Sequence, residues 1–159
     1  MNKIYIENNL ITYQSEFNGK HRKGYWTAHK DQSWALDLEK IIAIAGINCM
    51  DGDDDSYFLG FIDVDLNKYF INITWEIDGF KKLKELIENK LEIELTEWRN
   101  NVYNGTKIIY PKSFTNQKLY KKSLWKSIRK AMLLDHIADG ELNGNIFKRK
   151  TSANKVYSQ

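Results

Sequence analysis

The spacing of apolar residues changes once along this chain, near Phe80, and this change divides the chain into two kinds of structure. Before Phe80, short apolar runs separated by polar turn residues have the pattern of β-strands. From Phe80 onward, Leu83, Leu86, Ile87 and Leu91 have the spacing of one face of an amphipathic helix. Antiparallel strands followed by a helix predict an α+β domain.

Turn residues place the individual strands. A first hairpin is expected to turn at Asn8 and Asn9, and residues 65–68 are expected to form a tight turn between the two clearest strands. Asp78 is predicted to cap the helix, because its carboxylate can accept hydrogen bonds from amides of the first turn. The expected strands cover residues 4–6, 10–13, 25–28, 34–38, 41–49, 57–64 and 69–75.

The last third of the chain predicts a second, basic helix. Pro111 ends a short apolar stretch at residues 107–110, and a helical pattern follows between Gln117 and Asp135. Gathered on its polar side are Lys122, Lys126, Arg129 and Lys130. We therefore expect a β-rich domain with its capping helix at residues 1–95. Residues 96–159 would form an extension, carrying the basic helix, that packs on the same domain.

This order of elements resembles a known superfold. Antiparallel strands capped by one amphipathic helix, with Trp98 after it, look like the pleckstrin-homology-like fold, a barrel-like β-sandwich closed at one end by its helix. The resemblance covers about residues 1–95 and implies an antiparallel sheet or partly open barrel. Some members of that family hold phosphates in an early loop, which here contains Lys20, Arg22 and Lys23.

A second resemblance covers more of the chain and concerns function. It rests on an acidic turn before Tyr57-Phe58-Leu59, a helix opening at Gly79-Phe80, and the pairs Tyr110-Pro111 and Leu119-Tyr120. These features look like small bacterial proteins, some of which are associated with toxin–immunity loci. The resemblance implies a non-catalytic protein that neutralises a cognate toxin by occluding its active site.

Charge is strongly segregated along the chain. Residues 51–79 carry one Lys or Arg against eight Asp or Glu, whereas residues 100–159 carry 12 against three, within a total of +3. Four of the five residues at positions 51–55 are aspartates, namely Asp51, Asp53, Asp54 and Asp55. Toxins that act on nucleic acids are usually basic, and an acidic loop complements a basic cleft. The sequence thus predicts a protein-binding site at these aspartates, with a solvated acidic turn as the alternative.

Tryptophan adds two further candidates to this site. The chain has five tryptophans, of which at least three are expected in the core. Trp26 and Trp34 flank a polar loop and are predicted to be exposed anchors of the protein interface.

The alternative function is nucleic-acid binding or a scaffold role through the basic helix. Lys122, Lys126, Arg129 and Lys130 would face phosphates, and Tyr120 and Trp125 would offer stacking surfaces. However, lysine-rich helix faces are most often solvated, and the acidic segment would repel a polyanion. A protein partner is therefore favoured over nucleic acid.

Neither a metal, a cofactor nor catalysis is expected. Asp51, Asp53 and Asp55 match the opening of an EF-hand loop, but Ser56 replaces its glycine and Ile62 its glutamate. The three histidines match no zinc spacing, and no nucleophile elbow, P-loop or dinucleotide fingerprint occurs. Asp63 and Asp65 have the spacing of paired carboxylates, but they close a strand at a turn, where charged residues are common.

The remaining features predict a cytoplasmic protein that does not enter a membrane. Cys49 is the single cysteine, so no intramolecular disulfide can form. The first residues lack the apolar stretch of a signal peptide, and the longest uncharged apolar run, residues 41–47, is too short to span a bilayer. The oligomeric state does not follow from the sequence.

Overall fold

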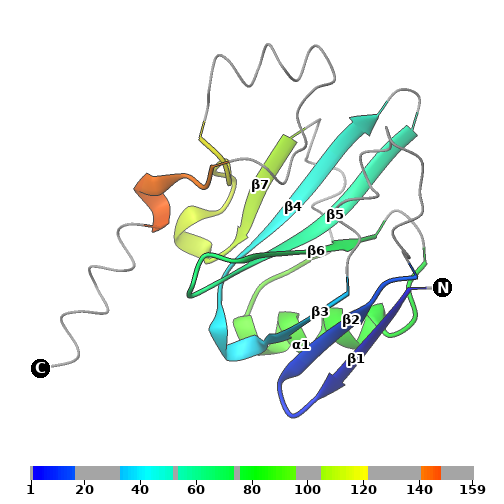
Figure 1. Ribbon diagram of the computed structural model, residues 1–159. Coiled ribbons are helices and arrows are strands. Elements are labelled where there is room, and N and C mark those ends of the chain that lie inside the picture. The colour runs from blue at the N-terminus through cyan, green and yellow to red at the C-terminus, as the bar shows by residue number, and fades with distance from the viewer. Residues whose placement is uncertain are drawn as a thin grey trace, which may run out of the picture.

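The computed structural model describes residues 2–16, 33–51, 54–73, 76–95, 105–121 and 141–147. Within these ranges the chain forms two antiparallel sheets, with strand orders β1-β2-β3 and β6-β5-β4-β7, and one 12-residue helix (Figure 1). The prediction of an α+β domain is therefore confirmed. The elements are β1 (Lys3–Glu7), β2 (Leu10–Gln14), β3 (Trp34–Asp37), the 3-10 helix η1 (Leu38–Lys40), β4 (Ile41–Asp51), β5 (Asp54–Asp63), β6 (Lys68–Asn72), α1 (Phe80–Leu91), β7 (Gly105–Tyr110) and the 3-10 helix η2 (Lys112–Phe114).

The first hairpin has the expected turn. Glu7 pairs with Leu10, so Asn8 and Asn9 form a two-residue loop. Both asparagines have positive φ angles, 46° and 70°, as a type I′ turn requires. The twist of this turn matches that of the two strands it joins.

The four-stranded sheet is buried on both faces, which explains the nearly continuous apolar run of β4. One face contributes to the main core through Ile44, Leu59, Phe61 and Ile71, all 1 % exposed or less. The opposite face packs under residues from the C-terminal part of the chain. That second cluster contains Ala43, Ala45, Ile62, Ile108, Leu119, Ile146 and Phe147.

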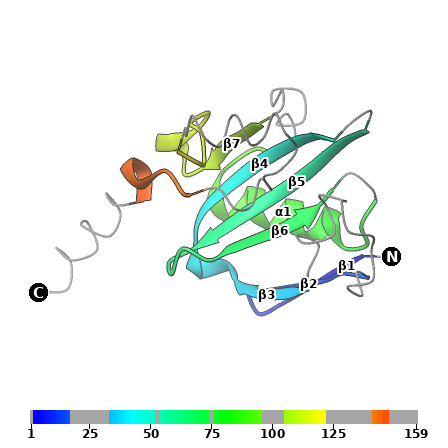
Figure 2. The ribbon, with the colours of Figure 1, turned by 45° about the horizontal axis from the view of Figure 1, so that its top comes forward.

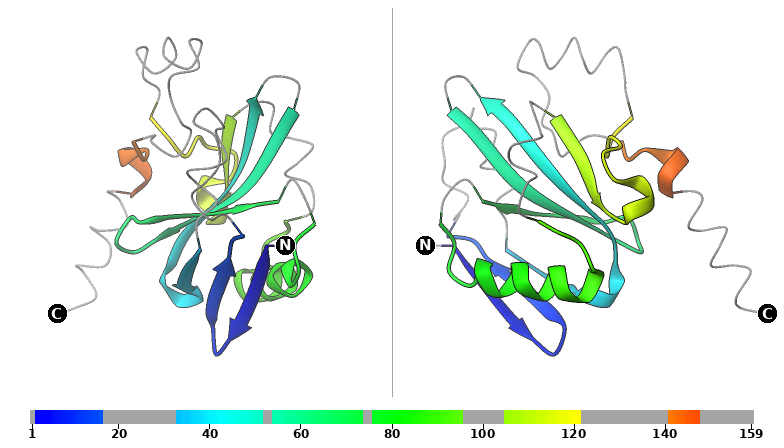
Figure 3. Two further views of the ribbon diagram at one scale, coloured as in Figure 1. Left: turned by 45° about the vertical axis from the view of Figure 1, so that its right-hand side comes forward. Right: turned by 180° about the vertical axis from the view of Figure 1, so that it is seen from behind.

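The main core lies between the two sheets and α1. Figure 2 shows the three-stranded sheet as a separate layer below the four-stranded sheet, and Figure 3 shows α1 running beside the smaller sheet. Leu83 and Ile87 of α1 are fully buried in this core, whereas Leu86 and Leu91 are half-buried at its edge. The predicted apolar face of the helix is thus the face that covers the core.

The two sheets do not close into a barrel within the described part of the chain. A strand also follows the helix, since β7 pairs with β4 after α1. All of the strands that the sequence predicted lie before the helix, so β7 was not among them. The polypeptide after residue 95 therefore completes the larger sheet.

The predicted helix cap is wrong. Gly79, with φ 83°, is the N-cap residue of α1, and no side chain caps the helix. Asp78 instead uses its backbone, because its carbonyl accepts a hydrogen bond from Ile4 N at 2.8 Å. A Cβ atom at Gly79 would lie 2.2 Å from the Ile4 carbonyl oxygen, so this close approach to β1 requires glycine.

The predicted start of the second helix at Gln117 is also wrong, because residues 117–121 are not helical. Their backbone groups bond to other segments: Ile108 N donates to Gln117 O at 2.9 Å, and Asn143 N donates to Leu119 O at 2.8 Å. The remainder of that helix, residues 122–135, lies outside the described residues, as do the expected strand at residues 25–28, Trp98 and the early basic loop.

Candidate binding surfaces

The aspartate cluster lies at the tip of the β4–β5 hairpin. Asp51 pairs with Asp54 across the β4–β5 hairpin. Gly52 and Asp53 themselves lie outside the described residues, and Asp55 follows as the partner of Met50. The backbone register therefore brings three of the four predicted aspartates, Asp51, Asp54 and Asp55, to the end of one hairpin.

Among the described residues, the β4–β5 hairpin extends beyond its two partner strands. β7 pairs with β4 only at residues 44–48, and β6 pairs with β5 only at residues 58–62, with one further backbone bond from Ile73 N to Tyr57 O. Beyond these positions no described strand lies beside the two strands, which form an arm (Figure 1). Asp51 and Asp54 stand directly opposite each other, and like charges in that arrangement destabilise a hairpin.

Trp34 lies between the two sheets. Its indole Nε1 donates a hydrogen bond to the backbone oxygen of Phe70 at 2.9 Å. Its ring lies 5.7, 5.8 and 5.5 Å from the rings of Tyr13, Phe61 and Tyr69, respectively. Trp34 is therefore half-buried at the edge of the core. The other predicted anchor, Trp26, lies outside the described residues.

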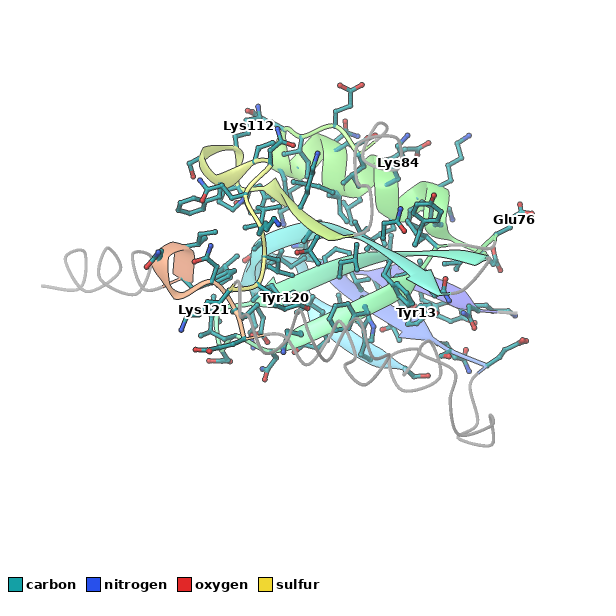
Figure 4. All side chains as sticks on the ribbon, turned by 90° about the horizontal axis from the view of Figure 1, so that it is seen from above. Tyr13, Glu76, Lys84, Lys112, Tyr120 and Lys121 are labelled. Carbon is teal, nitrogen blue, oxygen red and sulfur yellow. The ribbon has the colours of Figure 1, made fainter. Side chains whose placement is uncertain are left out.

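The residues of the alternative nucleic-acid site, Lys122, Lys126, Arg129 and Lys130, also lie outside the described residues. Tyr120, predicted as a stacking surface, is half-buried beside Lys68, whose Nζ lies 5.8 Å from the ring centroid. Figure 4 shows Tyr120 and Lys121 next to the helical turn at residues 144–147. An isolated bridge between Tyr120 and Leu142 connects the two segments.

Asp63 is a buried carboxylate with four hydrogen bonds. It is only 3 % exposed. Its Oδ1 accepts from the backbone amides of Asp65 and Asn67 at 2.9 and 2.8 Å, and its Oδ2 accepts from Asn67 Nδ2 at 2.9 Å and the Tyr69 hydroxyl at 2.8 Å. These donors organise the turn between β5 and β6, which confirms that Asp63 closes a strand at a turn.

The same contacts set the ionisation of this group. Burial opposes the charged form of Asp63, but the hydrogen bonds from Asn67, Tyr69 and the backbone together outweigh it, so the pKa of Asp63 is lowered. Burial, followed by the hydrogen bond to Asp63, raises the pKa of Tyr69. A carboxylate held ionised by four donors is suited to stabilising a turn and not to accepting protons.

Sequence reasoning missed three exposed apolar side chains, Leu10, Val64 and Leu66. Leu10 and Val64 belonged to the apolar pattern of the expected strands 10–13 and 57–64, and Leu66 lies in the turn between β5 and β6. The one available signal is that Leu66 occupies a turn position where polar residues or glycine are usual.

No group of three or more His, Cys, Asp or Glu side chains that could hold a metal ion occurs among the described residues. In the same part of the chain, no helix is long and apolar enough to cross a membrane. Comparison with family models, curated proteins and solved structures finds no match for the chain.

Proposed function

We propose that this protein is a non-catalytic binding domain that engages a basic protein partner through the tip of the β4–β5 hairpin. The specific form that we propose is a bacterial immunity protein, which neutralises a cognate toxin by occluding its active site. The observation that carries the proposal is the acidic arm: Asp51, Asp54 and Asp55 lie at the end of two strands that, within the described residues, extend beyond their partner strands, and Asp53 belongs to the same sequence cluster.

The acidic arm would complement a basic cleft in both shape and charge. A protruding hairpin can enter a cleft, and a concentration of carboxylates speeds the encounter with a basic surface. The opposed pair Asp51 and Asp54 reduces the stability of the hairpin, so a benefit outside folding accounts better for this pair.

We also propose that the fold is a divergent form of the pleckstrin-homology-like architecture. Two antiparallel sheets that share one core, with a helix over the open side, support this relationship. The position of β7 after the helix departs from it. The proposed function does not depend on this relationship.

A matched pair of triple variants tests the function. The purified chain captures partners from lysates of its native host, and the partner is identified, isolated and measured by surface plasmon resonance. Changing Asp53, Asp54 and Asp55 to asparagine should lower the association rate about tenfold or more at low salt and weaken its salt dependence.

The control variant changes Glu7, Glu76 and Glu85 to glutamine, which removes the same amount of charge from exposed positions elsewhere. It should retain most of the association rate. Equal losses in the two variants would show that net charge, and not the arm, governs binding.

A further inference from the structure

The described strands form two sheets with four edges, and three of these edges are engaged by other parts of the chain. The edge strands are β1, β3, β6 and β7. On β1, Ile4 N donates to Asp78 O at 2.8 Å, and on β7, Ile108 N donates at 2.9 Å to a carbonyl of the segment that follows η2. On β6, Phe70 O accepts the hydrogen bond from the Trp34 indole at 2.9 Å. These contacts occupy backbone groups that would otherwise be open to another strand.

β3 is the edge strand whose outer side makes no such contact among the described residues. Leu38 N donates to Asn9 O at 2.9 Å, so every second residue of β3, counted back from Leu38, directs its backbone groups toward β2. The backbone groups of the alternate residues, Ser33, Ala35 and Asp37, face away from β2. No backbone–backbone hydrogen bond within the described part of the chain uses them on that side.

The outer side of β3 is also accessible and unprotected. Ser33 and Ala35 are exposed to solvent. Proteins commonly protect an open edge with lysine, proline or a bulge. Residues 33–37 contain neither lysine nor proline, and β3 pairs with β2 without a shift of register. The edge can therefore pair with a further strand.

The sequence of this edge matches a second copy of itself. In an antiparallel arrangement with a two-fold axis at Ala35, the two alanines face each other, and Ser33 of each copy faces Asp37 of the other. Each facing pair can exchange two backbone N–H···O bonds. The alanines are small enough for close approach, and the serine hydroxyl can donate to the aspartate carboxylate. The two aspartates, whose charges would repel, do not face each other.

The same register suits the inner face of the strand. There the half-buried Trp34 of each copy would face Leu36 of the other, and an aromatic ring opposite an aliphatic side chain stabilises paired strands. A strand of unrelated sequence could form the backbone bonds as well. The side-chain matches on both faces favour a second copy of this chain.

We infer that β3 pairs with β3 of a second copy, joining the two three-stranded sheets into one continuous sheet across a two-fold axis. β4 begins directly after η1, and its 11 residues span roughly 35 Å to the acidic arm (Figure 1). The dimer therefore leaves both acidic arms free. The inference does not depend on the proposed function.

Sedimentation velocity of the full chain, from about 10 μM to 1 mM, tests this inference. The native chain should dimerise within this range. Ala35→Lys and Ala35→Glu should each raise the dimer Kd at least tenfold, because like charges would meet at the two-fold axis. Both variants should melt close to the native protein, since Ala35 is exposed. An equimolar mixture of the two should dimerise again, because only the mixed dimer places lysine opposite glutamate.

Tyr5→Lys is the matched control. Tyr5 lies in the same row of residues, since it pairs with Thr12, which pairs with Ala35, and it is 47 % exposed. The variant thus adds a lysine to the same face of the sheet, away from the β3 edge, and it should leave the Kd unchanged.

A native chain that stays monomeric up to about 1 mM overturns the inference. A dimer that Ala35→Lys leaves intact, or that Tyr5→Lys weakens equally, overturns it as well. If the native chain dimerises but the mixture of Ala35→Lys and Ala35→Glu stays monomeric, the two copies do not meet at Ala35.

Discussion

The indole of Trp34 donates a hydrogen bond to the backbone carbonyl of Phe70 at 2.9 Å, and this bond joins the two sheets. Trp34 begins β3 and Phe70 lies in β6, which are edge strands of the two different sheets. A side chain therefore makes this connection where a closed barrel would have a ladder of backbone bonds. Because the ring also packs against Tyr13, Phe61 and Tyr69, Trp34 fixes how the sheets face each other.

Trp34→Phe should destabilise the fold by about 1–3 kcal/mol, because it leaves the partly buried Phe70 carbonyl without this donor. Trp34→Ala should cost more, since it also removes the ring contacts. Urea unfolding followed by circular dichroism measures both. Tyr5→Phe is the control: the hydroxyl that it removes makes only an exposed 3.4 Å contact with Gln14, and its effect should stay below about 0.5 kcal/mol. Equal effects of Trp34→Phe and Tyr5→Phe would contradict the role of Trp34 in joining the sheets.

Gly79→Ala should be among the most destabilising small substitutions in this chain. Alanine at φ 83° is strained, and its Cβ would lie 2.2 Å from the Ile4 carbonyl oxygen. The backbone must then separate and weaken the bond from Ile4 N to Asp78 O. We expect a loss of at least about 3 kcal/mol in unfolding free energy, since strain and a lost bond both contribute.

Gly60→Ala is the matched control for this substitution. A Cβ at Gly60 would meet the side-chain ends of Ile47 and Phe70 at 3.2 and 3.3 Å, and such groups can move by a few tenths of an ångström. Its cost should stay below about 1.5 kcal/mol. Thermal melts of the two variants in parallel give the comparison, and a milder effect at Gly79 than at Gly60 would contradict the close approach to β1.

Asp63 should make the stability of the protein depend on acid pH. Its folded pKa is lowered from the ordinary value of 3.8, so its contribution is present above that value. The contribution is lost as the pH falls from 3.8 through the folded pKa. Asp63→Asn should lower the unfolding free energy by about 1–3 kcal/mol at pH 7. One acceptor oxygen, which receives two hydrogen bonds, would become an amide nitrogen that can only donate. The substitution should also make the unfolding free energy depend less on pH in the acid range.

Asp65→Asn provides the comparison for Asp63→Asn, since Asp65 is exposed and lies two residues away. Its unfolding free energy, measured by urea titration from pH 3 to 7, should follow that of the native protein. If the Asp63→Asn variant loses stability at acid pH as steeply as the native protein, another group is responsible for that loss.

The helix face can be tested by comparing two leucines. Leu83 is fully buried, so Leu83→Ala should cost about 2–5 kcal/mol through lost transfer energy and the cavity left behind. Leu86→Ala, at the half-buried edge, should cost clearly less. Chemical unfolding gives both values, and the reverse order would mean that α1 is rotated about its axis.

The features that sequence predicted well are those decided by nearby residues. The turn at Asn8 and Asn9 follows from their tolerance of positive φ, and α1 follows from the spacing of Leu83 and Ile87. The turn at the aspartates could also be predicted from neighbouring residues. Each of these depends on contacts within one hairpin or one helix.

The features that sequence missed depend on distant contacts. The start of α1 was predicted correctly, but its N-cap is Gly79 and not Asp78. Glycine is required there because the carbonyl of Ile4, 75 positions earlier, approaches too closely for any side chain. Residues 117–121 match a helical pattern, but their backbone bonds reach Ile108 and Asn143. Likewise, Trp34 seemed suited to an exposed anchor, and only the fold shows that Phe70 accepts its hydrogen bond. No pattern within a short stretch of sequence predicts these long-range contacts.

The two functional classes can be separated by comparing charge changes at the two predicted surfaces. If the acidic arm is the binding surface, nucleic acid should bind the native chain only at roughly 0.1 mM or more weakly in physiological salt, the range of non-specific contacts. Reversing Lys126 and Lys130 to glutamate should then leave partner binding intact, whereas neutralising Asp53, Asp54 and Asp55 weakens it.

Gel shifts across a salt series, beside partner capture, make this comparison. Lys82 and Lys112, exposed elsewhere on the chain, supply a control in which the same charge is reversed. If the basic segment is the binding surface instead, a sub-micromolar nucleic-acid complex should disappear on reversal of Lys126 and Lys130 but survive reversal of Lys82 and Lys112. Such a complex, with no protein partner captured, would refute the immunity proposal, because phosphate contacts and not the aspartates would then carry the affinity.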